Sequence, residues 1–213
     1  ALPISIYQKA KGLLLRELEE QLLPDGAHYE QSPMYHCILL DRLLDCYNVS
    51  VNNLRFIGQE GLNERLREKA GGMLGHLASV VYKDNTIPLL NDSAEGIAPS
   101  PTQLFAYAKR LDMDWEKLPM EACGYRKLMA GHWEAIVDVG DIRASYQPGH
   151  SHADMFNYEL RIGGKPFVMD TGISTYEKTA RRQYERGTAA HNTVMIGDKN
   201  SSEVWGGFRV GRR

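Results

Sequence analysis

The protein has 213 residues, 43% of them hydrophobic, and a net charge of −2 at neutral pH. That length and hydrophobic content are enough for one large domain or two small ones with a real core. The basic residues do not form a single block, so bulk charge gives no reason to expect nucleic acid as a partner, and no run reaches the roughly 18 apolar residues that a membrane span needs.

The first half of the chain is predicted to be helical. Leucines at helical spacing fill residues 6–23, and Pro24-Asp25-Gly26 ends this stretch. A second helix is expected after Ser32, a typical N-cap residue, with Pro33 at the first helical position. Two further helices are predicted, over residues 62–82 and 102–111. Short connections between these helices indicate an α/α array.

From about Tyr125 the hydrophobic period changes to two, which is typical of strands. The segments "HWEAIVDVG" and "MFNYELRIGGKPFVMDTG" alternate, and Gly163-Gly164 predicts a hairpin turn between two strands. The segment "HNTVMIGDKNSS", which begins at His191, predicts another strand that leads into a Gly-Asp turn. We therefore divide the chain into a helical part, residues 1–120, and an antiparallel β part, residues 121–213.

The three cysteines are Cys37, Cys46 and Cys123, and none of them forms a CxxC pair. Cys37 and Cys46 fall on opposite faces of one predicted helix, so we do not expect a disulfide bond between them. The odd count argues against a disulfide scaffold, and a cysteine-based zinc site is not expected.

The segment "PGHSHADM" places His150, His152 and Asp154 at alternate positions, which share one face of an extended chain. Imidazoles bind zinc well, and a carboxylate can complete or orient such a set. A polar surface turn explains the same pattern equally well. Asp170 and His191 each read as structural when taken alone. Together with His152 they would supply three metal ligands and leave one position for water or substrate.

Three other features have both a structural and a functional interpretation. Tyr35 lies one turn into the second predicted helix, where a phenol usually packs but can act as acid or base if it faces a cleft. Trp205 could stack on a sugar ring, although a tryptophan in a strand is more often part of the core. The basic cluster that includes Arg182 and Arg186 could attract an anionic ligand.

Four separated stretches together resemble the heparinase II/III-like polysaccharide lyases. They are "LLPDGAHYEQSPMYH", "PLLNDSAEGIAPSP", "PGHSHADMFNYELRIGGKPFVMDTGISTYE" and "RQYERGTAAHNTVMIGDKNSSEVWGGFRVGRR", in the family's order and over more than half of the chain. The resemblance implies an α+β protein: the C-terminal part of an incomplete (α/α) toroid, followed by an antiparallel β-sandwich that is truncated in this chain. It also implies a bacterial, periplasmic or secreted enzyme that cleaves acidic, uronic-acid-containing polysaccharides such as glycosaminoglycans by β-elimination.

The resemblance also implies roles for individual residues. Tyr35 matches the family's catalytic tyrosine and His150 its catalytic histidine, and these two are our acid/base pair. Substrate carboxylate or sulfate groups would be bound by Arg182 or Arg186, and a sugar ring by Trp205. In β-elimination a base removes the C5 proton of the uronic acid, an acid protonates the glycosidic oxygen, and positioned donors mask the carboxylate charge.

A zinc site is also implied by the resemblance. His152, Asp170 and His191 match a Zn²⁺-binding set seen in some members, with a structural or cleft-organising role. Asp154 then either fixes an imidazole tautomer or stabilises the turn. The family's carboxylate-neutralising Asn or His has no match here and is expected upstream of residue 1, so the chain as given is expected to be a fragment that depends on that segment for activity.

Two other functions stay open. A metal-dependent hydrolase could use His150, His152, Asp170 and His191, with a metal-activated water as nucleophile. A non-catalytic glycan-binding protein, for example one acting beside surface-polysaccharide biosynthesis, would bind the polymer without turnover. The products distinguish the three functions, because only a lyase creates a 4,5-unsaturated sugar.

Overall fold

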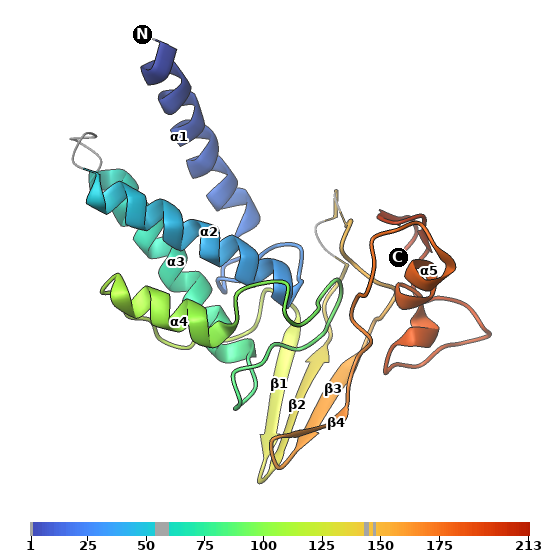
Figure 1. The fold of residues 1–213 in the computed structure, drawn as a ribbon. Coiled ribbons are helices and arrows are strands. Elements are labelled where there is room, and N and C mark those ends of the chain that lie inside the picture. Colours follow the sequence, from blue (N-terminus) through green and yellow to red (C-terminus); the bar gives the residue numbers. More distant parts are fainter. Residues whose placement is uncertain (1, 54–59, 143–144, 147) are drawn as a thin grey trace.

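The computed structural model describes residues 2–53, 60–142, 145–146 and 148–213, and it is a mixed α+β structure (Figure 1). The helices of the first half are α1 (Leu2–Gln21), α2 (Pro33–Asn52), α3 (Glu60–Val80) and α4 (Pro101–Arg110). A four-stranded sheet follows, made of β1 (Tyr125–Ala130), β2 (Trp133–Asp138), β3 (Tyr158–Ile162) and β4 (Lys165–Val168). The C-terminal segment carries α5 (Ala180–Glu185), the 3-10 helix η1 (Thr188–Ala190), β5 (Val204–Trp205) and β6 (Arg209–Val210).

Two helices begin where local capping signals predict. The Ser32 hydroxyl accepts a hydrogen bond from the backbone N–H of Tyr35, and Pro33 is the first residue of α2. Ser100 and Gln103 form a capping box at the start of α4. The cap on α2 also has a functional consequence, because it fixes Tyr35 within the first turn of that helix.

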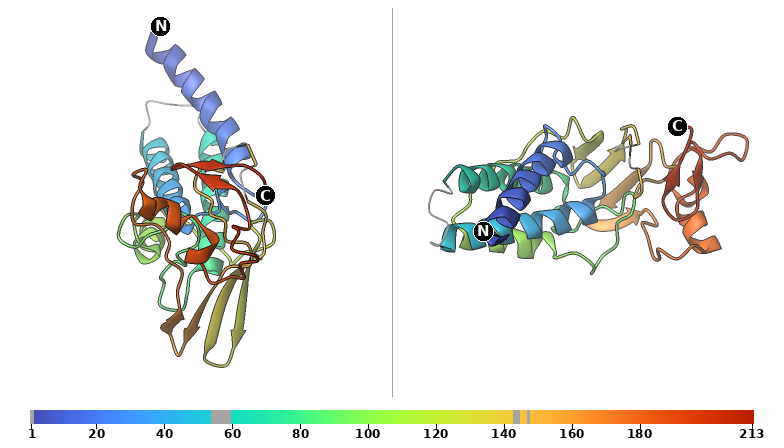
Figure 2. Two further views of the ribbon diagram at one scale, coloured as in Figure 1. Left: turned by 90° about the vertical axis from the view of Figure 1, so that its right-hand side faces the viewer. Right: turned by 90° about the horizontal axis from the view of Figure 1, so that it is seen from above.

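The helical core lies mainly between α2 and α3. Leu40 and Leu44 of α2, and Leu74 and Leu77 of α3, are fully buried there. α1 projects away from this pair (Figures 1 and 2), and much of its surface is exposed. None of the described helices is long and apolar enough to cross a membrane.

The sheet is antiparallel, with the strand order β1-β2-β3-β4. The predicted hairpin between β3 and β4 is confirmed: Gly163 and Gly164 both have positive φ, 59° and 77°, as the turn requires. The end of α3 is joined to the sheet by the buried Tyr82 hydroxyl, which donates to Glu159 of β3 at 2.7 Å. Helices, sheet and C-terminal segment thus lie in sequence across the molecule (Figures 1 and 2).

One expectation for the second half does not hold within the described residues. The strand predicted from His191 is absent, because only an isolated bridge joins Ile196 to Lys199 around the predicted Gly-Asp turn. The described strands form one four-stranded antiparallel sheet and a two-stranded ribbon, β5-β6, so the antiparallel part of the expected truncated sandwich is confirmed. Val194 and Ile196 are 78% and 81% exposed. Their alternating pattern therefore has no opposing sheet among the described residues against which to form a strand.

Candidate active site

The structure brings the two predicted acid/base residues into contact. Tyr35, from the first turn of α2, and His150, from the connection between β2 and β3, stack with ring centroids 4.0 Å apart and planes 14° from parallel. The Tyr35 hydroxyl is also hydrogen-bonded to the hydroxyl of Tyr176, at 2.8 Å. A phenol and an imidazole in this arrangement can share the two proton transfers of an acid/base reaction.

A carboxylate orients the His150 ring. Glu30, in the loop before α2, lies with its Oε2 2.9 Å from Nδ1 of His150. An ionised carboxylate can only accept a hydrogen bond, so Nδ1 carries the proton and Nε2 is the nitrogen that remains for chemistry. The neighbouring His28 is buried, and burial lowers its pKa to about 4, which keeps it neutral at pH 7. Sequence reasoning left Glu30 unassigned, because its partner lies 120 residues further along the chain.

Tyr176 is a second tyrosine at this site, in contact with Tyr35, and the sequence analysis assigned it no role. Its ring stacks on Phe208 with centroids 5.7 Å apart, and the Arg182 guanidinium lies 5.3 Å from the ring centre. Partial burial, the hydrogen bond to Tyr35 and the nearby Asp92 carboxylate raise its pKa. Tyr176 therefore keeps its proton, and it can donate a hydrogen bond to the Tyr35 oxygen when that oxygen carries negative charge.

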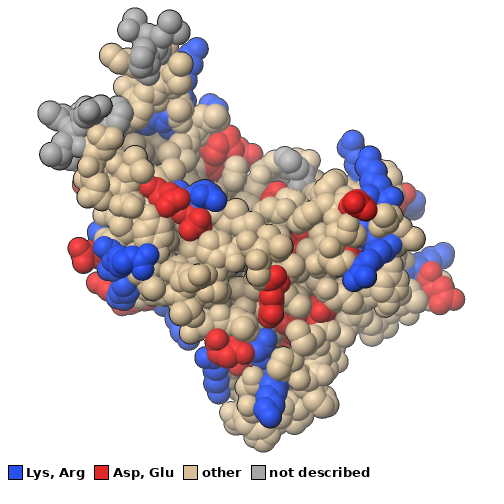
Figure 3. All heavy atoms as spheres, in the orientation of Figure 1, with Lys and Arg blue, Asp and Glu red and all other residues tan. Residues whose placement is uncertain are grey.

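A cavity of about 720 Å³ opens beside this group. Glu30, His150, Lys178, Trp205, Phe208 and Arg209 are among the residues that line it. The lysine, the arginine and Trp205 have exposed side chains. Figure 3 shows Lys and Arg side chains gathered over the part of the molecule that carries α5. Exposed cations and an accessible indole suit an anionic sugar chain.

The two arginines predicted to bind substrate face inward, which corrects their expected role. Arg182 and Arg186 are both fully buried. Arg182 forms a bidentate ion pair with Asp92, in which Nη2 lies 2.8 Å from Oδ2. Arg182 also donates a hydrogen bond to the Gly207 carbonyl. Arg186 donates to the Ser151 carbonyl at 3.0 Å. Their guanidinium groups hold loops of the molecule together and present no free surface to the cavity.

The predicted zinc set lies in two neighbouring carboxylate–imidazole pairs, one of which includes Asp92, a residue outside that set. Nε2 of His152 is 2.7 Å from Asp92, and Nδ1 of His191 is 2.7 Å from Asp170. The other ring nitrogens, Nδ1 of His152 and Nε2 of His191, are buried without a hydrogen-bond partner, and the rings lie 5.2 Å apart. A carboxylate on one nitrogen commonly leaves the other for a metal. These two nitrogens are therefore the atoms of this group that could bind Zn²⁺, which favours imidazole ligands.

Asp170, for which the resemblance implies a role as zinc ligand, lies here as the hydrogen-bond partner of His191. Its carboxylate also accepts hydrogen bonds from the Asn157 side chain, at 2.7 Å, and from the Gly172 backbone, at 2.8 Å. Asp154 instead belongs to the turn, where its carbonyl accepts from the Asn157 N–H at 2.8 Å. Asp92, which the sequence analysis does not single out, contacts both His152 and Arg182.

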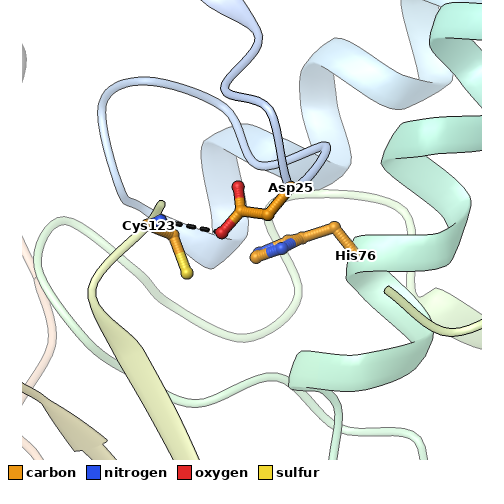
Figure 4. Close-up of side chains that lie close together, drawn as sticks. All are labelled: Asp25, His76 and Cys123. Carbon is orange, nitrogen blue, oxygen red and sulfur yellow. Dashed lines mark hydrogen bonds between the residues drawn. The ribbon is translucent and has the colours of Figure 1, made fainter. Parts of the chain in front are cut away.

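A second group of possible ligands lies at the junction between the helices and the sheet (Figure 4). Within the described part of the chain, Asp25, His76 and Cys123 are the one set that places three ligand atoms within 4.8 Å of one another. All three residues are buried. This group could hold a metal ion, and it shares no residue with the predicted zinc set.

Two overlapping family matches together cover residues 7–213 of the chain. Residues 7–119 match the model "Heparinase II/III N-terminus", and residues 112–213 match "Heparinase II/III-like, C-terminal". The chain belongs to the heparinase II/III-like family. This confirms the resemblance on which the roles of Tyr35 and His150 depend, while those roles themselves stay predictions.

Two curated relatives and several solved structures of this family are similar to the chain. It is 24% identical to heparin-sulfate lyases of Pedobacter heparinus and Bacteroides thetaiotaomicron, with 91% of the chain covered in each case. Among structures, the heparan sulfate lyase HepC from Pedobacter heparinus aligns over 91% of the chain with a TM-score of 0.68 and 20% identity. A structure of heparinase III aligns over 89% of the chain with a TM-score of 0.65 and 18% identity. The chain spans about a third of the length of these relatives.

Proposed function

We propose that this chain forms one side of the catalytic cleft of a polysaccharide lyase that cleaves uronic-acid glycans by β-elimination. The stacked Tyr35 and His150, at the edge of a cavity with exposed cationic side chains, carry this proposal. The relatives named as heparin-sulfate lyases make sulfated glycosaminoglycans the first substrate class to test.

The reaction needs one group to accept the C5 proton and another to protonate the glycosidic oxygen on C4. Tyr35 and His150 take these two parts, and the configuration of C5 in the substrate determines which residue takes which. Negative charge on the Tyr35 oxygen is stabilised by a hydrogen bond from Tyr176, and Glu30 holds His150 in one tautomer. The pair therefore needs no rearrangement of its own partners during the proton transfers.

The residues that we propose to bind substrate anions differ from those that the sequence suggested. Lys178 and Arg209 line the cavity with exposed side chains, whereas Arg182 is enclosed by Asp92 and Gly207. The proposal therefore assigns carboxylate and sulfate contacts to Lys178 and Arg209, and a sugar-ring contact to Trp205. The residue that neutralises the reacting carboxylate is assigned to an upstream segment of a longer protein.

Zinc belongs to the same proposal. His152 and His191 would hold it with their unpartnered nitrogens, and Asp92 and Asp170 would orient the two rings. When bound, the ion supplies a fixed positive charge that ties the His150 loop to the C-terminal segment. The (α/α) toroid, the complete β-sandwich and a periplasmic or secreted location are also proposed for the full-length protein.

The test uses full-length protein and a panel of heparan sulfate, chondroitin, hyaluronan and alginate. A rise in ultraviolet absorbance from the unsaturated product is expected on at least one polymer. Tyr35→Phe should abolish that rise, whereas Tyr184→Phe, at an exposed tyrosine away from the cavity lining, should leave it unchanged. Saturated products, binding without turnover, or a fully active Tyr35→Phe would each contradict the proposal.

A further inference from the structure

The junction between the helical layer and the sheet contains a buried group of mixed chemistry. Asp25 comes from the loop after α1, His76 from α3, and Cys123 from the segment just before β1. Their exposed fractions are 6%, 4% and 0%, so the group is closed to solvent. Figure 4 shows the three side chains directed toward one another.

One ring nitrogen in this group lacks a partner. Nδ1 of His76 is buried and has no hydrogen-bond partner. Burial lowers the pKa of His76 to about 4, so the imidazole is neutral at pH 7 and has a lone pair to offer. A buried ring nitrogen without a hydrogen-bond partner is available to bind a metal.

The backbone holds this group in place before any ion binds. A Cβ on Gly26 would lie 2.2 Å from the Gly72 carbonyl oxygen of α3, so only glycine permits the loop to approach the helix this closely. The Asp25 carboxylate accepts a hydrogen bond from the Cys123 backbone N–H at 2.8 Å. The loop carrying Asp25 is thereby fixed against both α3 and the segment carrying Cys123.

We infer that Asp25, His76 and Cys123 form a metal site, separate from the predicted His152–His191 site, that binds a divalent transition metal such as Zn²⁺. The ligands are a carboxylate oxygen, an imidazole nitrogen and a thiolate sulfur, a set typical of zinc. Tetrahedral zinc holds its ligand atoms about 3.4 to 3.7 Å apart. Atoms that already lie within 4.8 Å of one another reach that spacing by small side-chain rotations.

Binding of a metal ion by this group releases one proton. Burial and the nearby Asp25 carboxylate raise the pKa of Cys123 to about 12, so the free protein carries a thiol. As the metal enters, the S–H bond breaks, a sulfur–metal bond forms, and one proton passes to solvent. The resulting ion would connect the α1–α2 loop, α3 and the start of the sheet, which are distant in sequence.

A thiolate-specific probe separates this site from the predicted zinc set, which contains no sulfur. Metal-free intact protein, kept reduced, is titrated with Co²⁺, and the sulfur-to-cobalt charge-transfer absorption is recorded in the near ultraviolet. The His191→Ala background is used in parallel, so that the result does not depend on the other site or on lyase activity. We expect a band that saturates at one Co²⁺ per chain in both backgrounds and is displaced by Zn²⁺.

The matched variants are Cys123→Ser and Cys46→Ser, because Cys46 is an exposed thiol outside the group. Cys123→Ser should lose the band and the zinc-dependent rise in Tm, and Cys46→Ser should keep both. A folded wild-type protein without the band at saturating Co²⁺ would overturn the inference, even if Cys123→Ser fails to fold. A band lost in Cys46→Ser would overturn it as well.

Discussion

Replacing Asp92 with Asn would leave Arg182 as a buried cation without its counterion. Both residues are fully buried, and two of the guanidinium nitrogens bond to the Asp92 carboxylate. Burial alone would raise the pKa of Asp92, but hydrogen bonds from His152 and Arg182 hold it below its usual value. The pair is thus ionised and connects the segment before α4 to α5.

The expected cost follows from this burial. Removing one partner of a buried ion pair destabilises a protein by about 3 to 5 kcal/mol, because the remaining charge stays desolvated and uncompensated. We therefore expect Asp92→Asn and Arg182→Met each to lower the free energy of unfolding by about that amount. The double variant contains no uncompensated buried charge. Its loss of unfolding free energy should therefore be smaller than the sum of the two single losses by at least about 2 kcal/mol.

Urea unfolding of the four proteins, followed by circular dichroism, measures this coupling. Arg181→Met is the control, because the Arg181 side chain is 71% exposed and its ion pair with Glu185 should contribute less than about 1 kcal/mol. Additive effects of the two buried substitutions would refute the reasoning. So would an Arg182→Met protein of normal stability that has lost only glycan affinity, which would restore the substrate-binding role.

Three further outcomes are expected. Tyr176→Phe should lower kcat about tenfold by removing one hydrogen bond worth roughly 1.4 kcal/mol in the transition state, while Tyr184→Phe has no effect, as measured by initial rates. Glu30→Gln should lower kcat and displace its pH profile, with partial rescue by Glu30→Asp; an unchanged profile would exclude a positioning role. Burial depresses the pKa of His28 from 6.5 to about 4, so its contribution to stability is present above pH 6.5 and is lost as pH falls toward 4. Between pH 6.5 and pH 4 the free energy of unfolding, measured with urea, should therefore fall by roughly 3 kcal/mol less in His28→Gln than in wild type. His132→Gln, at an exposed position, should show the same pH dependence as wild type.

Local signals accounted for much of the fold. The Ser32 cap and Pro33 placed the start of α2, and Gly163-Gly164 placed the β3–β4 turn, because each depends on residues a few positions apart. The strand predicted from His191 failed for the opposite reason. Alternating apolar and polar residues indicate only that one face of a segment could pack against a second sheet. The described residues contain no such sheet for Val194 and Ile196.

Sequence by itself determined the order of the elements and the residue types of the site. Family motifs selected Tyr35 and His150, and the structure then showed that their rings stack. Side-chain direction and partnership were decided only by tertiary structure. Arg182 turns inward because Asp92, 90 residues earlier, neutralises it in a place that water does not reach. Spacing rules for cysteine motifs likewise overlooked Cys123, because its partner Asp25 lies 98 residues away and only packing against α3 brings them together.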